Sequence, residues 1–134
     1  MGIKTTKDSI DLGIVTNNAS AMLAFYRDVL GLPHQGDLPL PMGGKMHRLL
    51  CGTTVLKLVS LDKQPANKPA PGGLTGGTGY RYFTVSVSNL DDVVAAAKRA
   101  GAKVAMGRTK VRAGVEIAML EDPDGNWVEL LEQS

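Results

Sequence analysis

The feature that most constrains the fold is an internal repeat, because the two halves predict the same order of elements. A strand, a helix preceded by asparagine, a stop at glycine and further strands are expected twice. Thr16-Asn17-Asn18 aligns with Val87-Ser88-Asn89, and Lys57-Leu58 aligns with Glu129-Leu130. The repeat predicts an α+β protein of two tandem βαβββ modules, each with one sheet face under its helix. The other two faces, set together, would form a half-barrel cleft.

In the first half, alternating apolar residues predict a strand over residues 10–16. Asn17 or Asn18 is expected to cap the helix that follows, and Gly31 to end it. Two more strands are predicted over 45–51 and 54–61, joined tightly through Gly52. The helix should bury the apolar residues that recur at helical spacing, which are Met22, Phe25, Tyr26 and Val29.

The second half ends in the strongest local signal of the chain, the turn Asp122-Pro123-Asp124-Gly125. Proline presets φ at the second turn position, and glycine supplies the left-handed residue. The flanking segments are therefore the arms of a hairpin, and Glu129 is a carboxylate in the middle of its second arm. Before the hairpin, strands are expected over 82–87 and 102–106 with an Asn89-capped helix between them, and another strand over 114–120.

A length of 134 residues predicts one domain. We expect a first module over about residues 8–61, a connector over 62–79 and a second module over about 80–132. The connector is rich in glycine and proline, and flexible linkage is its simpler interpretation, with a lid over a site as the alternative. Its glycines do not form a phosphate-binding pattern, because no strand leads in and no helix follows.

Composition excludes some classes of partner. A net charge of +2 without a basic run gives no support for nucleic acid or a membrane surface. No apolar run long enough to span a bilayer and no leader peptide is expected. The single Cys51 cannot form a disulfide within the chain, which favours the cytoplasm.

Two segments carry a family resemblance, Ala24-Phe25-Tyr26-Arg27-Asp28-Val29-Leu30-Gly31-Leu32 and the closing run from Glu121 to Leu130. With the module order, they make the chain resemble the vicinal-oxygen-chelate (VOC) superfamily of glyoxalase I, bleomycin-resistance proteins, extradiol dioxygenases and methylmalonyl-CoA epimerase. The resemblance spans nearly the whole chain. It implies paired βαβββ modules, often a homodimer, and a cleft that binds a small organic molecule and in some members one divalent metal.

The resemblance also implies where that metal would bind. The four ligand positions of metal-dependent members correspond to Asp11, Lys57, Tyr82 and Glu129, where histidine, glutamate or glutamine is usual. Only Glu129 is a usual ligand, and Asp11 is the one plausible substitute. A charged lysine has no lone pair to give, so no metal and no other cofactor is expected at this site.

The same four residues suggest acid/base chemistry. Lys57, flanked by Asp11 and Glu129, could replace the charge of the metal and stabilise an enolate-like oxyanion. One carboxylate would be the general base, and Tyr82 would donate a hydrogen bond. The alternative is that Lys57 only neutralises the carboxylates. Trp127, His47 and Thr84 are candidate substrate contacts.

Three functions are therefore open. The first is a metal-independent lyase, isomerase or epimerase acting on a small carbonyl-containing molecule. The second is a binding or resistance protein that sequesters a small molecule without reacting with it. The third is a metal-dependent glyoxalase or dioxygenase, which the ligand positions disfavour.

Overall fold

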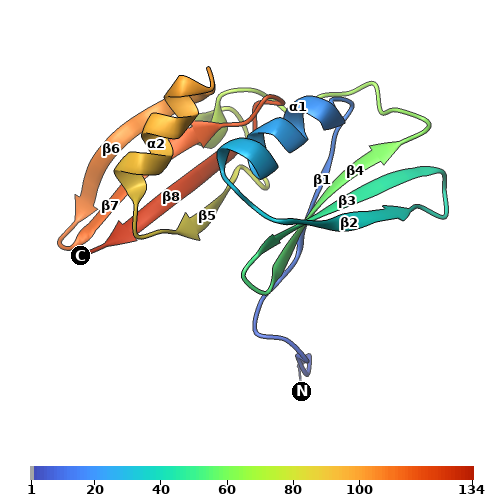
Figure 1. Cartoon of the computed structure of the whole chain (residues 1–134), viewed down its shortest axis with the longest axis horizontal. Helices are drawn as coiled ribbons and strands as arrows, with labels where there is room; N and C mark the ends of the chain where they lie inside the picture. The colour runs from blue at the N-terminus through green and yellow to red at the C-terminus, as the bar shows by residue number, and fades with distance from the viewer. Residues whose placement is uncertain (1) are drawn as a thin grey trace. The chain divides into compact units, whose positions relative to one another are not determined.

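The computed structural model describes residues 2–134 and divides into two compact units between Ala66 and Asn67. Each unit contains one four-stranded sheet and helical turns packed against it (Figure 1). The repeat in the sequence is thus a repeat in structure, and the two βαβββ modules are confirmed. The second part of the expected connector, residues 67–79, belongs to the second unit.

The first unit contains the sheet β1-β4-β3-β2. Its strands are β1 (Leu12–Val15), β2 (His34–Pro39), β3 (Gly44–Cys51) and β4 (Thr54–Leu61), and β1 runs parallel to β4. Leu56 and Leu58 of β4 pair with Leu49 and His47 of β3, so these four side chains share one face. The three leucines are buried, and α1 packs on β4. We call this the helix face of the first sheet.

The strand β2 was not among the strands expected from the sequence. Prolines 33 and 39 and Gly36 interrupt its pattern. It forms nevertheless because it is an edge strand that pairs only with β3. An edge strand needs hydrogen bonds on one side alone, which is the place where a sheet tolerates proline and a bulge.

The first helical segment is α1 (Ala19–Leu23) followed by a π-helical turn (Ala24–Val29). Phe25 and Tyr26 are both buried, and their rings meet edge to face with centroids 4.8 Å apart. The expected asparagine cap is wrong in detail, because Asn18 stands at the N-cap position without a side-chain cap bond. The Thr16 hydroxyl instead accepts a hydrogen bond from the backbone N–H of Asn18, at 2.9 Å.

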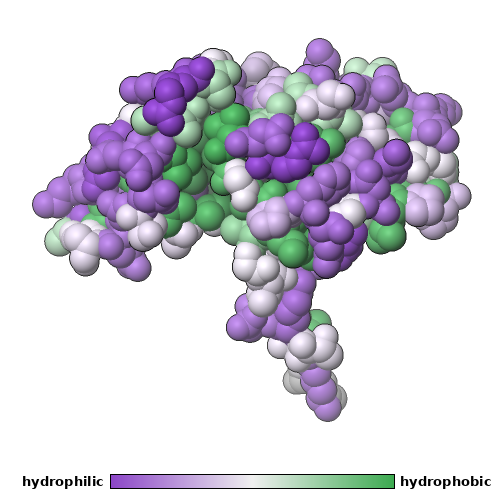
Figure 2. Space-filling model, in the orientation of Figure 1, coloured by the Kyte–Doolittle hydropathy of each residue, from purple (hydrophilic) through white to green (hydrophobic). Residues whose placement is uncertain are grey.

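The second unit contains the sheet β5-β8-β7-β6. Its strands are β5 (Tyr82–Ser86), β6 (Lys103–Arg112), β7 (Val115–Glu121) and β8 (Trp127–Gln133). The helix α2 (Leu90–Arg99) packs on β6, β7 and β8 and buries Leu90, Val94 and Ala97. In Figure 2 the surface over α2 is largely hydrophilic, with hydrophobic residues visible between the polar ones.

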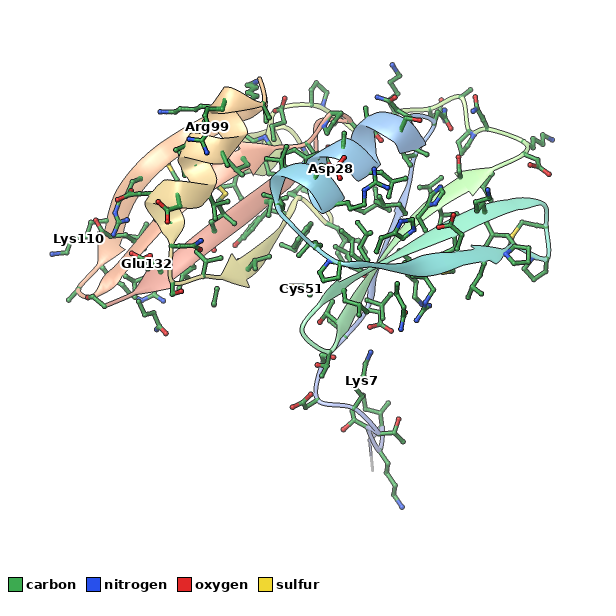
Figure 3. The ribbon with its side chains drawn as sticks, viewed as in Figure 1. Lys7, Asp28, Cys51, Arg99, Lys110 and Glu132 are labelled. Atoms are coloured by element: carbon green, nitrogen blue, oxygen red, sulfur yellow. The ribbon has the colours of Figure 1, made fainter. Side chains whose placement is uncertain are left out.

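A hub of charges connects α2 with three strands of its sheet. Arg108 donates to Asp91, Glu116 and Glu132 at 3.1, 2.6 and 2.9 Å. Glu132, which lies beside the start of α2 in Figure 3, also accepts from the Leu90 backbone N–H at 3.0 Å and so caps the helix. Asn89 makes no side-chain cap bond. Residues 108–112, which follow the strand expected over 102–106, also lie on β6, because that strand is longer than its apolar part.

The turn between β7 and β8 forms as expected. The buried Asp122 accepts hydrogen bonds at 2.9 Å from the backbone N–H groups of Asp124 and Asn126 and from the Asn126 side chain. Gly125 has a φ of 91°, which favours glycine. The turn fixes the register of β7 against β8 and therefore the face on which Glu129 projects. No helix in the part of the chain described by the structure is long and apolar enough to cross a membrane.

Candidate functional site

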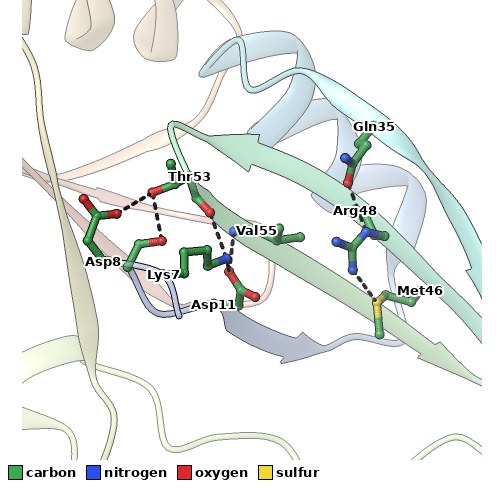
Figure 4. Close-up of polar contacts among 9 residues, drawn as sticks. Lys7, Asp8, Asp11, Gln35, Met46, Arg48, Thr53 and Val55 are labelled. Atoms are coloured by element: carbon green, nitrogen blue, oxygen red, sulfur yellow. Dashed lines mark hydrogen bonds and ion pairs between the residues drawn. The ribbon is translucent and has the colours of Figure 1, made fainter. Parts of the chain in front are cut away.

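The first sheet carries two cations on the face opposite its helix face. Arg48 of β3 pairs directly with Lys57 of β4, so both side chains project from the same face. Arg48 donates to the Gln35 side chain at 3.1 Å and lies 3.9 Å from the Met46 sulfur (Figure 4). Among residues 2–134, Lys57 donates no hydrogen bond. We call this surface, formed by Gln35, Arg48 and Lys57, the Lys57 face.

Asp11 belongs to the same unit but is engaged in holding the chain together. Its Oδ1 accepts from the Lys7 ammonium at 2.7 Å and from the Val55 backbone N–H at 2.8 Å (Figure 4). Lys7 also donates to the Thr53 carbonyl at 2.9 Å. The Lys7 hydrogen bond, followed by that of Val55, lowers the pKa of Asp11, and the charge of Lys57 contributes least. A carboxylate held in this way is a poor general base.

In the second sheet, the face away from α2 carries Tyr82, Thr84, Trp127 and Glu129. The parallel pairing of β5 with β8 sets Tyr82 beside Trp127 and Thr84 beside Glu129. The Thr84 hydroxyl donates to Glu129 Oε1 at 2.7 Å. The bond fixes the carboxylate in one orientation. We call this set of four residues the Glu129 face.

Trp127 is covered by the segment that precedes β5. Gly73, in a short 3-10 turn (Gly73–Thr75), is buried and packs so closely on the indole that a Cβ there would overlap the ring. Arg81 donates to the carbonyls of Gly73 and Ala70 at 2.7 and 2.8 Å, and the indole N–H donates to Glu121 at 3.0 Å. This part of the expected flexible connector is therefore held in place, and Trp127 offers less of its ring to a ligand than the sequence suggested.

His47 lies on the helix face of the first sheet, opposite Lys57. It pairs with Leu58, whereas Arg48 pairs with Lys57. His47 and Arg48 are neighbours on β3, so only one of them can share the face of Lys57, and the register against β4 decides for Arg48. A substrate contact from His47 would have to be made on the other side of this sheet. Gln35 was missed entirely, because β2 was not expected as a strand.

The residues at the four VOC ligand positions do not fit a divalent metal. Transition-metal sites in proteins are built from imidazole, thiolate and carboxylate donors. Here an ammonium and a phenol take two of the four positions, and an oxygen of a third residue, Asp11, already accepts two hydrogen bonds. A divalent metal at these positions would therefore lack the donors that it needs.

The order of elements, the two-sheet architecture and the carboxylate on the last strand define the class of this protein. The sequence profile of the Glyoxalase/Bleomycin resistance protein/Dioxygenase superfamily matches residues 9–130. The chain belongs to this superfamily. Comparison with curated proteins gave no match.

Solved structures confirm the fold. A glyoxalase family protein from Bacillus cereus is similar with a TM-score of 0.82 and 14% identity, over 99% of this chain and 98% of that one. Lactoylglutathione lyase from Agrobacterium tumefaciens has a TM-score of 0.66 and 24% identity, over 96% of both chains. The trypanothione-dependent glyoxalase I of Leishmania major has a TM-score of 0.70 and 19% identity, over 95% of this chain and 87% of that one.

Proposed function

We propose that this protein is a metal-independent acid/base enzyme, a lyase or an isomerase, that acts on a small carbonyl compound carrying a negative charge. The observation that carries the proposal is the direct pairing of Arg48 with Lys57 on the Lys57 face. Like charges paired across strands destabilise a sheet. An anionic ligand would offset this repulsion, and the free ammonium of Lys57 would stabilise an oxyanion.

Arg48 and Lys57 suit different parts of such a ligand. A guanidinium binds a carboxylate or phosphate through two parallel hydrogen bonds, whereas an ammonium acts as a compact charge. We therefore propose that Arg48 binds the anionic group of the substrate and that Lys57 binds the carbonyl oxygen of the substrate. Gln35 supports Arg48 through its hydrogen bond at 3.1 Å.

In the second unit, Glu129 is the general base of the proposal. Thr84 donates to only one of its oxygens, Oε1. The other oxygen can take a proton from a carbon next to the carbonyl, and Tyr82, which is 47% exposed on the same face, can donate a hydrogen bond. Asp11, the other carboxylate considered as general base, has a structural role instead, because it accepts hydrogen bonds from Lys7 and from the Val55 backbone N–H.

Deuterium exchange next to a carbonyl tests the chemistry. Protein treated with a chelator would be incubated in D2O with a panel of small 2-oxo and 3-oxo carboxylates, and proton loss followed by NMR. We expect exchange of at least one compound, lowered about 100-fold or more by Lys57→Met and by Glu129→Gln. Lys45→Met is the matched control, since Lys45 lies on the same hairpin but pairs with Ser60 on the opposite face.

The results separate the competing functions. If the Lys57→Met variant turns over at the rate of the unchanged protein, the proposed role of Lys57 is wrong. A compound that binds one per chain and is recovered unchanged would favour the sequestration function. Turnover that disappears with the chelator and returns with added metal would favour a metal-dependent glyoxalase. The homodimer that the family resemblance implies is a separate proposal, and light scattering would show it as twice the chain mass of 14.2 kDa.

A further inference from the structure

Both histidines of the chain converge on one carboxylate oxygen in the first unit. His34 Nε2 lies 2.7 Å and His47 Nδ1 lies 2.8 Å from Asp37 Oδ1. The three donor atoms lie within 4.8 Å of one another. The His34 and His47 rings are inclined at 66°, with centroids 6.0 Å apart. Two imidazoles and a carboxylate are therefore presented to one point in space.

A bulge in the edge strand creates this arrangement. Asp37 pairs directly with His47 across the β2–β3 ladder, so the two share a face. In a regular strand, His34 would point away from Asp37, since the two are an odd number of residues apart. The register shifts between His34 and Gly36, where two steps along β2 match one step along β3. This bulge turns His34 onto the face of Asp37, and Gly36 accommodates it with a φ of 153°.

The cluster is reachable from solvent and separate from the Lys57 face. The side chains of His47, His34 and Asp37 are 12%, 25% and 36% exposed, so access increases toward the edge of the sheet. The hydrogen bond with His34, followed by that with His47, lowers the pKa of Asp37 and keeps its carboxylate ionised. His47 belongs to the helix face, whereas Arg48 and Lys57 project from the other side of the same sheet.

We propose that His34, Asp37 and His47 form a binding site for one divalent transition-metal ion, of the class of Zn²⁺, Ni²⁺ or Co²⁺. Two imidazoles and one carboxylate are a donor set that these ions favour. The site lies outside the four ligand positions of the VOC resemblance. It goes beyond the proposed acid/base function and does not depend on it.

The present hydrogen bonds and a bound ion use the same atoms in different protonation states. Each imidazole now directs a ring nitrogen at Asp37. To bind a metal, each neutral ring carries its proton on the outer nitrogen and offers the inner lone pair. Metal–ligand distances of about 2.0–2.2 Å place neighbouring donors about 3.0–3.4 Å apart, so each imidazole nitrogen has to move about half an ångström away from Asp37 Oδ1. The two imidazole nitrogens, which now lie within 4.8 Å of each other, also have to approach. The partial exposure of Asp37 and His34 gives water access to the remaining coordination positions.

Arg27 opposes the ion and supplies an independent test. It lies on the π-helical turn, and the negative charge of Asp37 contributes to raising its pKa, although its main partner is Asp28 at 2.8 Å. A dication at the cluster would be repelled by this guanidinium. Arg27→Gln should therefore strengthen metal binding, whereas a purely structural His–Asp–His cluster gives no reason for such a gain.

Metal titration of the untagged, chelator-treated full chain tests the inference. We expect Zn²⁺ calorimetry to show one ion per chain, and Co²⁺ to give the absorption bands of a histidine-ligated ion. His34→Ala and Asp37→Ala should each weaken binding about tenfold or more, and acid should weaken it because protonated imidazoles cannot ligate. Asp62→Ala is the control for an exposed carboxylate of the same unit. Circular dichroism confirms that each variant is folded.

Three results would overturn the inference. The first is the absence of any heat or absorption change at millimolar ion. The second is equal binding by the His34→Ala and Asp62→Ala variants. The third is binding lost in Glu129→Gln or Asp11→Asn but kept in His34→Ala, which would place the ion at the VOC ligand positions. Failure here leaves the proposed function untouched, because deuterium exchange is measured on metal-free protein.

Discussion

At the scale of single residues, one carboxylate is a candidate for chemistry, whereas others stabilise the fold. Glu129 is held by one hydroxyl and keeps an oxygen available, whereas Asp11 and Asp122 accept several hydrogen bonds that organise the backbone. The same side-chain chemistry therefore serves as a candidate base in one place and as a structural acceptor in another. The number and type of donors around each carboxylate decide between these roles.

Asp122→Ala should be among the most destabilising substitutions in the closing turn. It removes the acceptor of three donors, two backbone N–H groups and the Asn126 side chain, at a position that is 3% exposed. We expect the free energy of unfolding to fall by about 3 kcal/mol, since hydrogen bonds to charged groups contribute about 1.5–3 kcal/mol each and are not additive.

Urea denaturation followed by circular dichroism measures this change. Asp124→Ala is the control from the same turn, because its backbone N–H, not its side chain, donates to Asp122. A loss for Asp122→Ala no larger than that for Asp124→Ala would show that the carboxylate does not hold the turn.

At the scale of elements, both helices begin without the asparagine cap that the sequence predicts. Thr16, two residues before the N-cap residue Asn18, and Glu132 of β8 accept backbone N–H groups at the starts of these helices instead. The 3-10 turn at Gly73–Thr75 is another case in which contacts override composition. A segment of glycine and proline is expected to be flexible, yet this one is fixed by packing on Trp127 and by the bonds of Arg81.

Gly73→Ala should detach this turn from the indole ring. A Cβ at residue 73 would overlap the ring, and the φ of 56° also favours glycine. Because Trp127 is the only tryptophan of the chain, tryptophan fluorescence reports the surroundings of this one indole ring. We expect a red-shifted emission, stronger acrylamide quenching and faster proteolysis within residues 67–79.

Gly77→Ala is the matched control in the same segment. A Cβ at that position meets its nearest neighbour, the Ala70 side chain, at an ordinary 3.6 Å, and its φ is not positive. It should leave fluorescence and proteolysis unchanged. If the two variants behave alike, the close packing of Gly73 does not hold the turn.

At the scale of the whole molecule, acid should remove stability from both units. The first unit contains Asp11, Asp28 and Asp37, and the second contains Glu116 and Glu132. Partners lower the pKa of each: mainly Lys7 for Asp11, Arg27 for Asp28, His34 for Asp37, Arg108 for Glu116, and the Leu90 N–H for Glu132. A carboxylate whose pKa is lower in the folded chain contributes its full stabilisation of the fold at any pH above its pKa in the unfolded chain.

The stabilisation by these carboxylates is lost as pH falls from their pKa in the unfolded chain, near 3.8 for aspartate and 4.5 for glutamate, through their lower pKa in the folded chain. We therefore expect the melting temperature to hold near neutral pH and to drop below about pH 4.5. Arg108→Ala should be less stable at pH 7 and show a shallower drop in acid, because Glu116 and Glu132 lose their main cation. A slope equal to that of the unchanged protein would contradict the role of Arg108.

Several features of the fold depend only on local sequence pattern. The repeat, the hairpin turn, every strand of residues 2–134 except β2, and the alternation that sets Tyr82, Thr84, Trp127 and Glu129 on one face follow from residue periodicity and turn chemistry. These features were predictable because each is fixed by neighbours in the chain.

Which residues meet across strands depends on pairing between distant segments of the chain. The register of β3 against β4 sets Arg48, not His47, beside Lys57, and the bulge in the unexpected edge strand brings His34 to Asp37. A shift of one residue moves every side chain to the opposite face, so local pattern cannot supply the register. The acid/base candidates came from the repeat and the resemblance, while the His–Asp–His cluster exists only because distant segments pair.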